Sequence, residues 1–116
     1  MSDANEMTAA LLVEIPKRYP GVRIWRNNRI DAMALGAGGR LRRVKAGVDG
    51  QADLSGIGPG GVRIEIEVKA GRDKMSKSQI AFQAMILNHG GIYIEARDVD
   101  ECMAALREEI RQRTRY

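Results

Sequence analysis

Eight residues near the middle of the chain alternate strictly between apolar and polar side chains: Val62, Arg63, Ile64, Glu65, Ile66, Glu67, Val68 and Lys69. Strict alternation predicts a β-strand with one apolar and one polar face, because successive strand side chains point to opposite sides. The glycine-rich segment 56–61 precedes this run, and Asp53-Leu54-Ser55 precedes the glycines. We therefore expect two strands joined by a turn, with two acids and two bases on one face of the second strand.

Three other segments have apolar residues at helical spacing, and each begins with a residue that caps helices well. Helices are expected from Asp3 to Ile15, from Ser76 to the Gly90-Gly91 pair, and from Asp98 into a basic tail. Pro16 is expected to end the first helix, because proline has no backbone N–H to donate. Alternation predicts a strand over 22–26, and the short apolar run 92–94 predicts another.

The order of these elements predicts the fold class. Helix, strand, loop, strand pair, helix, strand and helix make an α/β domain with a mixed central β-sheet flanked by α-helices. At 116 residues the chain is long enough for a single domain over 1–116 with one modest core. The loop in this order, 35–45, combines three glycines with four cations, and a basic hairpin or loop is expected there.

Composition and charge narrow the classes of function. The chain has 19 Lys and Arg residues against 15 Asp and Glu, a net charge of +4, which modestly favours a polyanionic partner such as DNA. The single cysteine, Cys102, excludes an internal disulfide and a cysteine-rich zinc site. No apolar run is long enough to span a bilayer, and Asp3 and Glu6 stand where a secretion signal would need basic residues, so a cytoplasmic protein is expected.

The acids around the glycine-rich turn indicate metal-dependent chemistry. If the two strands pair, Asp53 and Glu67 converge on one cation, and carboxylate oxygens are the ligands that Mg²⁺ prefers. Lys69 lies two residues beyond Glu67 and so on the same strand face, where its ammonium can orient water or stabilise developing negative charge. This combination suits phosphodiester hydrolysis, in which attack builds charge on an anionic phosphorus centre.

The residues of this constellation resemble a known family. Asp53, the Glu67-Val68-Lys69 triplet and Gln79 on the next helix are similar to the motif of the virus-type replication-repair nuclease (VRR-NUC) domain, a branch of the PD-(D/E)XK restriction-endonuclease-like superfamily. Other similar segments are the glycine-rich approach 47–52, Trp25-Arg26-Asn27-Asn28 and Gly90-Gly91-Ile92-Tyr93. The resemblance spans roughly residues 6–98, and it departs from the superfamily's name at Ala52, where that name has proline.

The resemblance implies a restriction-endonuclease-like core and endonucleolytic hydrolysis of DNA with Mg²⁺ or Mn²⁺ as cofactor. It implies catalytic roles for Asp53, Glu67, Lys69, Gln79 and a glutamate on the early helix, which here is Glu6. The implied metal ligands are Asp53, Glu67, Glu6 and the backbone carbonyl of Val68. Small stand-alone members, often encoded by phages, resemble homodimeric Holliday-junction resolvases, so a homodimer that acts on branched DNA in a bacterial or phage-infected cell is expected.

Several of these residues have a second interpretation. Gln79 forms a capping-box pattern with Ser76, and Glu6 forms one with Asp3, so each is either an active-site residue or a helix cap; Glu14 is a rival to Glu6 on the same helix. Six residues are candidates for DNA contact: Arg26, Asn28, Arg40, Arg42, Arg43 and Lys45. Solubilising charge is the alternative for the last four. Glu65 is expected as a solvated or paired surface acid.

Two other functions stay open on the sequence. A non-catalytic DNA-binding module of the same fold would keep the basic surface, but it would have no physical need for acids that face a polyanion. A restriction-like or nicking nuclease on duplex DNA would use the same catalytic residues, since substrate shape is recognised by surfaces that residue spacing does not reveal.

Overall fold

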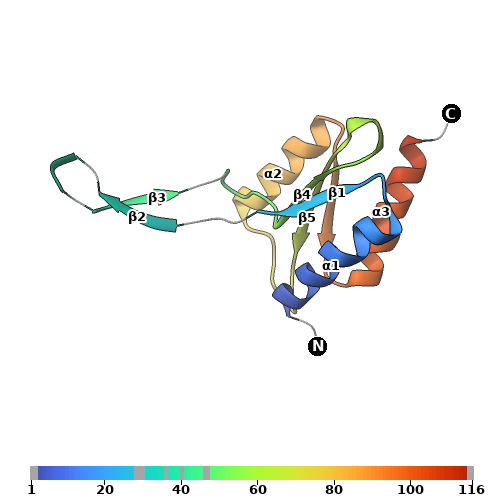
Figure 1. Cartoon of the computed structure of the whole chain (residues 1–116), viewed down its shortest axis with the longest axis horizontal. Coiled ribbons are helices and arrows are strands. Elements are labelled where there is room, and N and C mark those ends of the chain that lie inside the picture. Colours follow the sequence, from blue (N-terminus) through green and yellow to red (C-terminus); the bar gives the residue numbers. More distant parts are fainter. Residues whose placement is uncertain (1–2, 28–30, 36, 40, 46–47, 115–116) are drawn as a thin grey trace.

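A mixed four-stranded sheet is flanked by three helices, and a separate two-stranded hairpin extends beside it (Figure 1). The computed structural model describes residues 3–27, 31–35, 37–39, 41–45 and 48–114, apart from the side chains of 31–37 and 41–45. The helices are α1 (Ala4–Arg18), α2 (Lys77–Asn88) and α3 (Val99–Arg113). The strands are β1 (Arg23–Arg26), β2 (Asp31–Leu35), β3 (Leu41–Lys45), β4 (Leu54–Ile57), β5 (Arg63–Val68) and β6 (Ile92–Ala96).

The main sheet has the strand order β1-β4-β5-β6. β1 and β5 each pair antiparallel with β4, whereas β6 pairs parallel with β5 because the chain crosses over through α2 between them. The turn between β4 and β5 passes through Gly60 and Gly61, whose positive φ angles of 73° and 81° suit glycine. The α/β class, the mixed sheet and the turn-joined strand pair are therefore confirmed.

The two faces of the sheet pack against different helices. Apolar residues of α1 and α3 cover one face and form the main core, which contains Leu11, Leu54, Ile64, Ile66, Ile92 and Leu106. On the other face a smaller cluster joins Phe82 and Ile86 of α2 to Ala52 and Tyr93. Because β6 gives Ile92 and Ile94 to the first cluster and Tyr93 to the second, its alternation assigns the two clusters to opposite faces.

Helix α1 begins where the sequence predicts but continues past Pro16, so the predicted end is wrong. The Asp3 side chain accepts a hydrogen bond from the Glu6 amide at 2.8 Å and caps the helix. Pro16 lies in the last turn, where its missing amide removes one hydrogen bond, and the Tyr19 amide still donates to the Ile15 carbonyl at 2.8 Å. A proline this close to a helix end does not stop the turn from closing.

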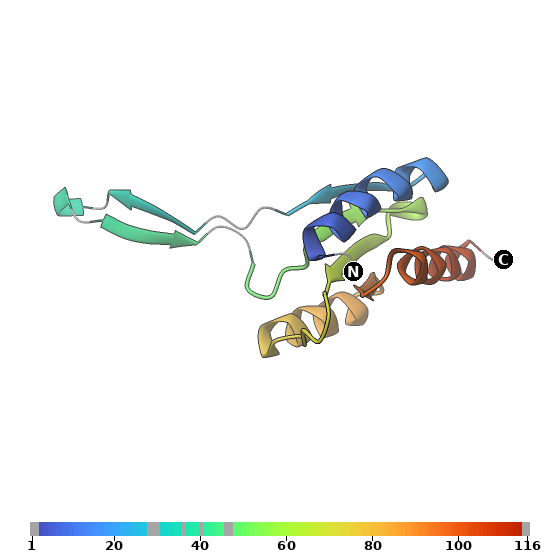
Figure 2. The same cartoon turned by 90° about the horizontal axis from the view of Figure 1, so that it is seen from below.

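The hairpin of β2 and β3 projects from the main sheet, as Figures 1 and 2 show from two sides. Its antiparallel register pairs Asp31 with Lys45 and Leu35 with Leu41. The projection accounts for a molecule 59 Å long but only 34 Å and 26 Å in its other dimensions. A basic hairpin is confirmed here, and it begins at Asp31, four residues before the predicted start, because 31–35 supplies the partner strand for β3.

None of the described helices is long and apolar enough to cross a bilayer.

Candidate active site

The sheet face under α2 is polar and largely buried. Ser55 and Glu65 have no solvent exposure, and only 2% of Glu67 is exposed. Glu65 accepts hydrogen bonds from Ser55 Oγ at 3.0 Å and from Arg63 Nε at 2.7 Å. The expectation of a paired Glu65 is confirmed and its expected surface position is wrong, because β5 lies between two strands and α2 packs on this face.

Asp53 and Glu67 meet at one end of the β4–β5 pair. Asp53 directly precedes β4, one position beyond the Leu54–Ile66 pair of the ladder, so it lies opposite Glu67. The Val68 amide donates a hydrogen bond to Asp53 Oδ2 at 2.7 Å. This bond fixes the Asp53 carboxylate at the end of β5, beside the Glu67 side chain.

Gln79 connects the acid to the base. Its Nε2 donates to Glu67 Oε2 at 2.6 Å, and its Oε1 accepts from Lys69 Nζ at 2.8 Å. Lys69 Nζ itself lies 3.8 Å from Glu67 Oε2. Gln79 also completes the capping box of α2 with Ser76, whose amide donates to Gln79 Oε1 at 2.8 Å. The two interpretations of Gln79 are therefore compatible, since one side chain caps the helix and contacts both Glu67 and Lys69.

The surroundings of Glu67 favour its protonated form. Burial, the hydrogen bond with the Asp53 carboxyl group and the negative charge of Asp53 raise the pKa of Glu67 from 4.5 to about 8, against the opposing effect of the Lys69 ammonium. Two carboxylates in contact repel each other when both are ionised. A divalent cation bound to both would remove this repulsion, so the acid pair has the electrostatic character of a cation site.

The donor set fits Mg²⁺ bound through two carboxylates, because this ion keeps several of its waters in most protein sites. Among the residues that the structure describes, no three His, Cys, Asp or Glu side chains are grouped to hold a metal ion. Glu6 is exposed on the first turn of α1 and does not join Asp53 and Glu67. The backbone N–H of Val68 donates to the Asp53 carboxylate. This contact does not show that the Val68 carbonyl faces the site as a metal ligand.

Asn27 positions the backbone around Asp53, and the sequence alone did not identify it as a site residue. Its Nδ2 donates to the Ala52 carbonyl at 3.0 Å and to Ser55 Oγ at 2.6 Å. Its amide donates to the Asp53 carbonyl at 2.9 Å. An asparagine at the end of a strand carries no functional signal in a sequence. The pairing of β1 with β4 is what brings Asn27 next to Asp53.

The residues expected to contact DNA are spread over two parts of the molecule. Arg26 Nη2 donates to Asn5 Oδ1 of α1 at 2.9 Å, so this side chain lies on the sheet face opposite Asp53. Arg42, Arg43 and Lys45 lie on β3, although their side chains are outside the described part of the chain. Asn28 and Arg40 lie outside the described residues.

Three further cations lie between Lys69 and Gln79 along the chain. Arg72, Lys74 and Lys77 are exposed on the loop that leads from β5 into α2 and on the first residue of that helix. The sequence signal for them was available, since three cations occur within six residues. The hydrogen bond between Lys69 and Gln79 shows that the segment carrying these cations begins and ends at the candidate active site.

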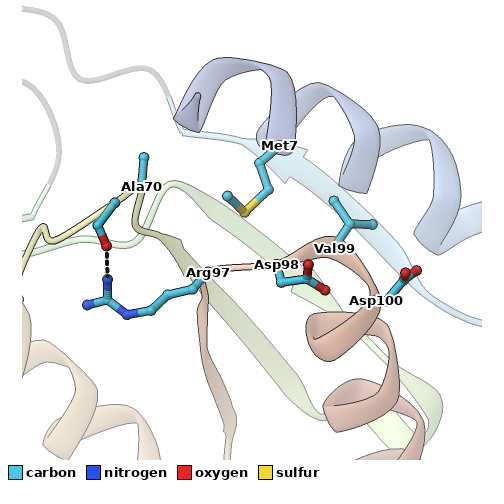
Figure 3. A pocket seen from close by; sticks show the side chains of 7 residues that line it. Met7, Ala70, Arg97, Asp98, Val99 and Asp100 are labelled. Atoms are coloured by element: carbon cyan, nitrogen blue, oxygen red, sulfur yellow. Dashed lines mark hydrogen bonds between the residues drawn. The ribbon is translucent and has the colours of Figure 1, made fainter. Parts of the chain in front are cut away.

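A pocket of about 340 Å³ lies between the start of α1, the loop after β5 and the start of α3 (Figure 3). It is lined by Met7, Ala70, Gly71, Arg97, Asp98, Val99 and Asp100. Arg97 donates to the Gly71 carbonyl at 3.1 Å and holds the loop. Asp98 caps α3, and acids at a helix start are favoured by the helix dipole, so the lining has a structural explanation.

Comparisons with family models, with curated proteins and with solved structures found no match for this chain. The interpretation of the site therefore depends on its own geometry and on the residue motif.

Proposed function

We propose that this protein is a metal-dependent DNA endonuclease with Asp53, Glu67 and Lys69 in its active site. The observation that carries the proposal is the continuous contact from Asp53 through Glu67 and Gln79 to Lys69, at 2.6 Å and 2.8 Å across the glutamine. A buried carboxylate beside a partly buried one, next to a lysine, is costly to a fold and useful to a nuclease.

The residues divide the chemistry among them. Asp53 and Glu67 would hold Mg²⁺ or Mn²⁺, which when bound polarises the phosphate and supplies an activated water. The Lys69 side chain is 12% exposed, and its ammonium, 3.8 Å from Glu67 Oε2, would neutralise charge that develops on a phosphate oxygen. Gln79 occupies one of the three ammonium donors and leaves the others for the substrate.

Cations on two sides of the site supply the DNA contacts. Arg72, Lys74 and Lys77 are exposed in the segment that joins Lys69 to Gln79, and they would contact the phosphates nearest the cleaved bond. The basic β2–β3 hairpin, with Arg42 and Arg43, would reach the DNA backbone farther from that bond, since it projects from the sheet (Figure 2). Binding by many phosphate contacts would depend steeply on salt.

The resemblance to the VRR-NUC domain supports the finer parts of the proposal. It favours a restriction-endonuclease-like version of the α/β fold, a homodimer, and branched replication or recombination intermediates as substrates. A dimer would present two active sites to two strands, as symmetric junction cleavage needs.

The experiment is cleavage of end-labelled four-way junction, flap and linear duplex DNA with Mg²⁺, Mn²⁺ or EDTA, by the native protein and by Lys69→Ala. Cutting that needs metal and Lys69 supports the nuclease, and the preferred substrate tests the junction assignment. Tight binding without cutting under every metal condition would replace the nuclease with the non-catalytic DNA-binding module.

A further inference from the structure

One polar atom near the acid pair lacks the partner that burial requires. Within the described part of the chain, the Tyr93 hydroxyl is the buried side-chain polar atom that has no hydrogen-bond partner. Buried hydroxyl groups are nearly always hydrogen-bonded, because an unsatisfied one loses its bonds to water without replacement. The position of this hydroxyl therefore needs an explanation beyond packing.

Tyr93 lies on the same face of the sheet as the acids. Tyr93 lies opposite Glu65 in the parallel β5–β6 ladder, on the face that carries Glu67. It packs against a cluster of Phe82, Ile86 and Ala52, and Ala52 directly precedes Asp53. Burial first, and then the negative charge of Glu67 before that of other nearby acids, raises the pKa of Tyr93 above its ordinary value. The hydroxyl thus stays protonated and able to donate.

Within the described residues this donor has no hydrogen-bond partner, and the charges that help to raise its pKa are those of carboxylates, Glu67 first among them. A bridging water satisfies both kinds of group at little cost in energy, and hydrogen-bond donors behind metal ligands orient those ligands. The alternative is that the tyrosine serves packing alone, in which case its oxygen would be a small burden to the fold.

We propose that Tyr93 is a positioning residue of the metal site: through a bridging water, its hydroxyl orients the Asp53 and Glu67 carboxylates for a divalent cation. This inference rests on the proposed function, because it concerns the cation that the nuclease would use. It adds to the residues of the motif a group that neither binds metal nor touches DNA. Its loss should change the affinity for metal more than the fold.

The test is Tyr93→Phe, which removes only the oxygen and keeps the ring against Phe82 and Ile86. The melting temperature is measured without metal and across a Mg²⁺ titration in the absence of DNA, and cleavage is measured across the same titration. We expect the Mg²⁺ midpoint to rise by about 10-fold or more in both measurements, as is usual when a group behind a metal ligand is removed. The metal-free melting temperature should change little, because the ring keeps its packing against Phe82 and Ile86.

Tyr19→Phe is the matched control, since Tyr19 packs against the main core at the end of α1, on the other sheet face. It should leave the Mg²⁺ midpoint unchanged. A Tyr93→Phe protein with the native midpoint would overturn the inference while leaving the nuclease intact. A native protein that Mg²⁺ neither stabilises nor activates would overturn the proposed function, and the role of Tyr93 with it.

Discussion

The two faces of the main sheet come from neighbouring residues of the same strands, yet they bury opposite kinds of side chain. On β5, Ile64 and Ile66 are fully buried in the core beneath α1 and α3. Glu65 and Glu67, the residues that follow them, are buried to nearly the same extent on the other face. The apolar face gains stability from burial, whereas the polar face needs compensation for every charge that it removes from water.

The two acids of β5 also differ from each other. Glu65 is compensated by the Arg63 guanidinium and by Ser55 Oγ. Glu67 has one good donor in Gln79, a lysine at 3.8 Å and a like-charged neighbour in Asp53. A buried carboxylate whose negative charge is fully balanced by donors is typical of a structural role. One whose charge is only partly balanced is typical of a functional site, such as a cation site.

The largest expected effect is on the polar face, where removing the Lys69 ammonium should slow cleavage without destabilising the fold. Lys69→Ala should lower the rate of DNA cleavage by about 10²–10³-fold or more, because a charge-stabilising group at the phosphate is lost. The rate constants are measured under saturating DNA, with circular dichroism to check the fold. Lys17→Ala, at an exposed position on α1, is the control and should cleave normally. A Lys69→Ala protein within a few-fold of the native rate would remove this residue from the mechanism.

On the apolar face the same kind of truncation should affect stability instead. Ile66→Ala should lower the free energy of unfolding by about 2–5 kcal/mol, since it leaves a cavity in the main core. Denaturant unfolding measures this change. A loss under about 1 kcal/mol would show that the core relaxes around the site, and would weaken the contrast between the faces.

The pH dependence of stability should identify Glu67. Its carboxyl group has a pKa of about 8 in the fold against 4.5 as the ordinary value, so folding takes up a proton and stability falls as pH rises through that window. Glu67→Gln should remove this fall and raise the metal-free melting temperature at pH 8, roughly by the 4–8 °C that about 1 kcal/mol represents in a domain this small.

Thermal unfolding of both proteins at pH 5 and pH 8 without metal measures this effect, with Glu101→Gln, an exposed change on α3, as the control. Mg²⁺ should stabilise the native protein more at pH 8 than at pH 5, because the cation replaces the proton. Parallel pH profiles for the native and Glu67→Gln proteins would contradict the strained acid pair.

The smallest expected effect concerns the hairpin, which lies outside both faces. Replacing Arg42 and Arg43 together with glutamine should weaken DNA binding and reduce the slope of log affinity against log salt by up to about 2, since each phosphate contact contributes about 0.9. Fluorescence anisotropy across a salt series measures the slope. Arg107→Gln, at an exposed position on α3, is the control. An unchanged slope in the double variant would remove the hairpin from the DNA interface.

Local sequence patterns predicted the elements that carry the site. Alternation over 62–69 and the glycine-rich turn predicted the strand pair that brings Asp53 opposite Glu67. The pattern from Ser76 to Gln79 predicted the capping box of α2. These features depend on neighbours within a few residues, so a single sequence contains the information.

The features that were missed depend on contacts between distant segments. The alternation of residues 62–69 predicted that Glu65 lies on the polar face of β5. It could not predict that α2 packs on this face and buries Glu65. Asn27 acquires its role through the pairing of β1 with β4, and the unpaired hydroxyl of Tyr93 is evident only in three dimensions. Pro16 was expected to end α1, but the sequence does not show that the helix ends only two residues after it, where a proline is tolerated.

If the protein is the nuclease proposed above, its polar face is kept for metal-dependent cleavage at a cost to the stability of the fold. The most direct measurement compares the melting temperature and the DNA cleavage of Asp53→Asn with those of the native protein, with and without Mg²⁺. Asparagine keeps an oxygen that can accept from the Val68 amide but removes the charge beside Glu67. We predict a metal-free melting temperature equal to or above the native value, no stabilisation by Mg²⁺ and no cleavage. An Asp53→Asn protein that still cuts DNA, or that Mg²⁺ stabilises as it does the native protein, would contradict a metal site at Asp53 and Glu67.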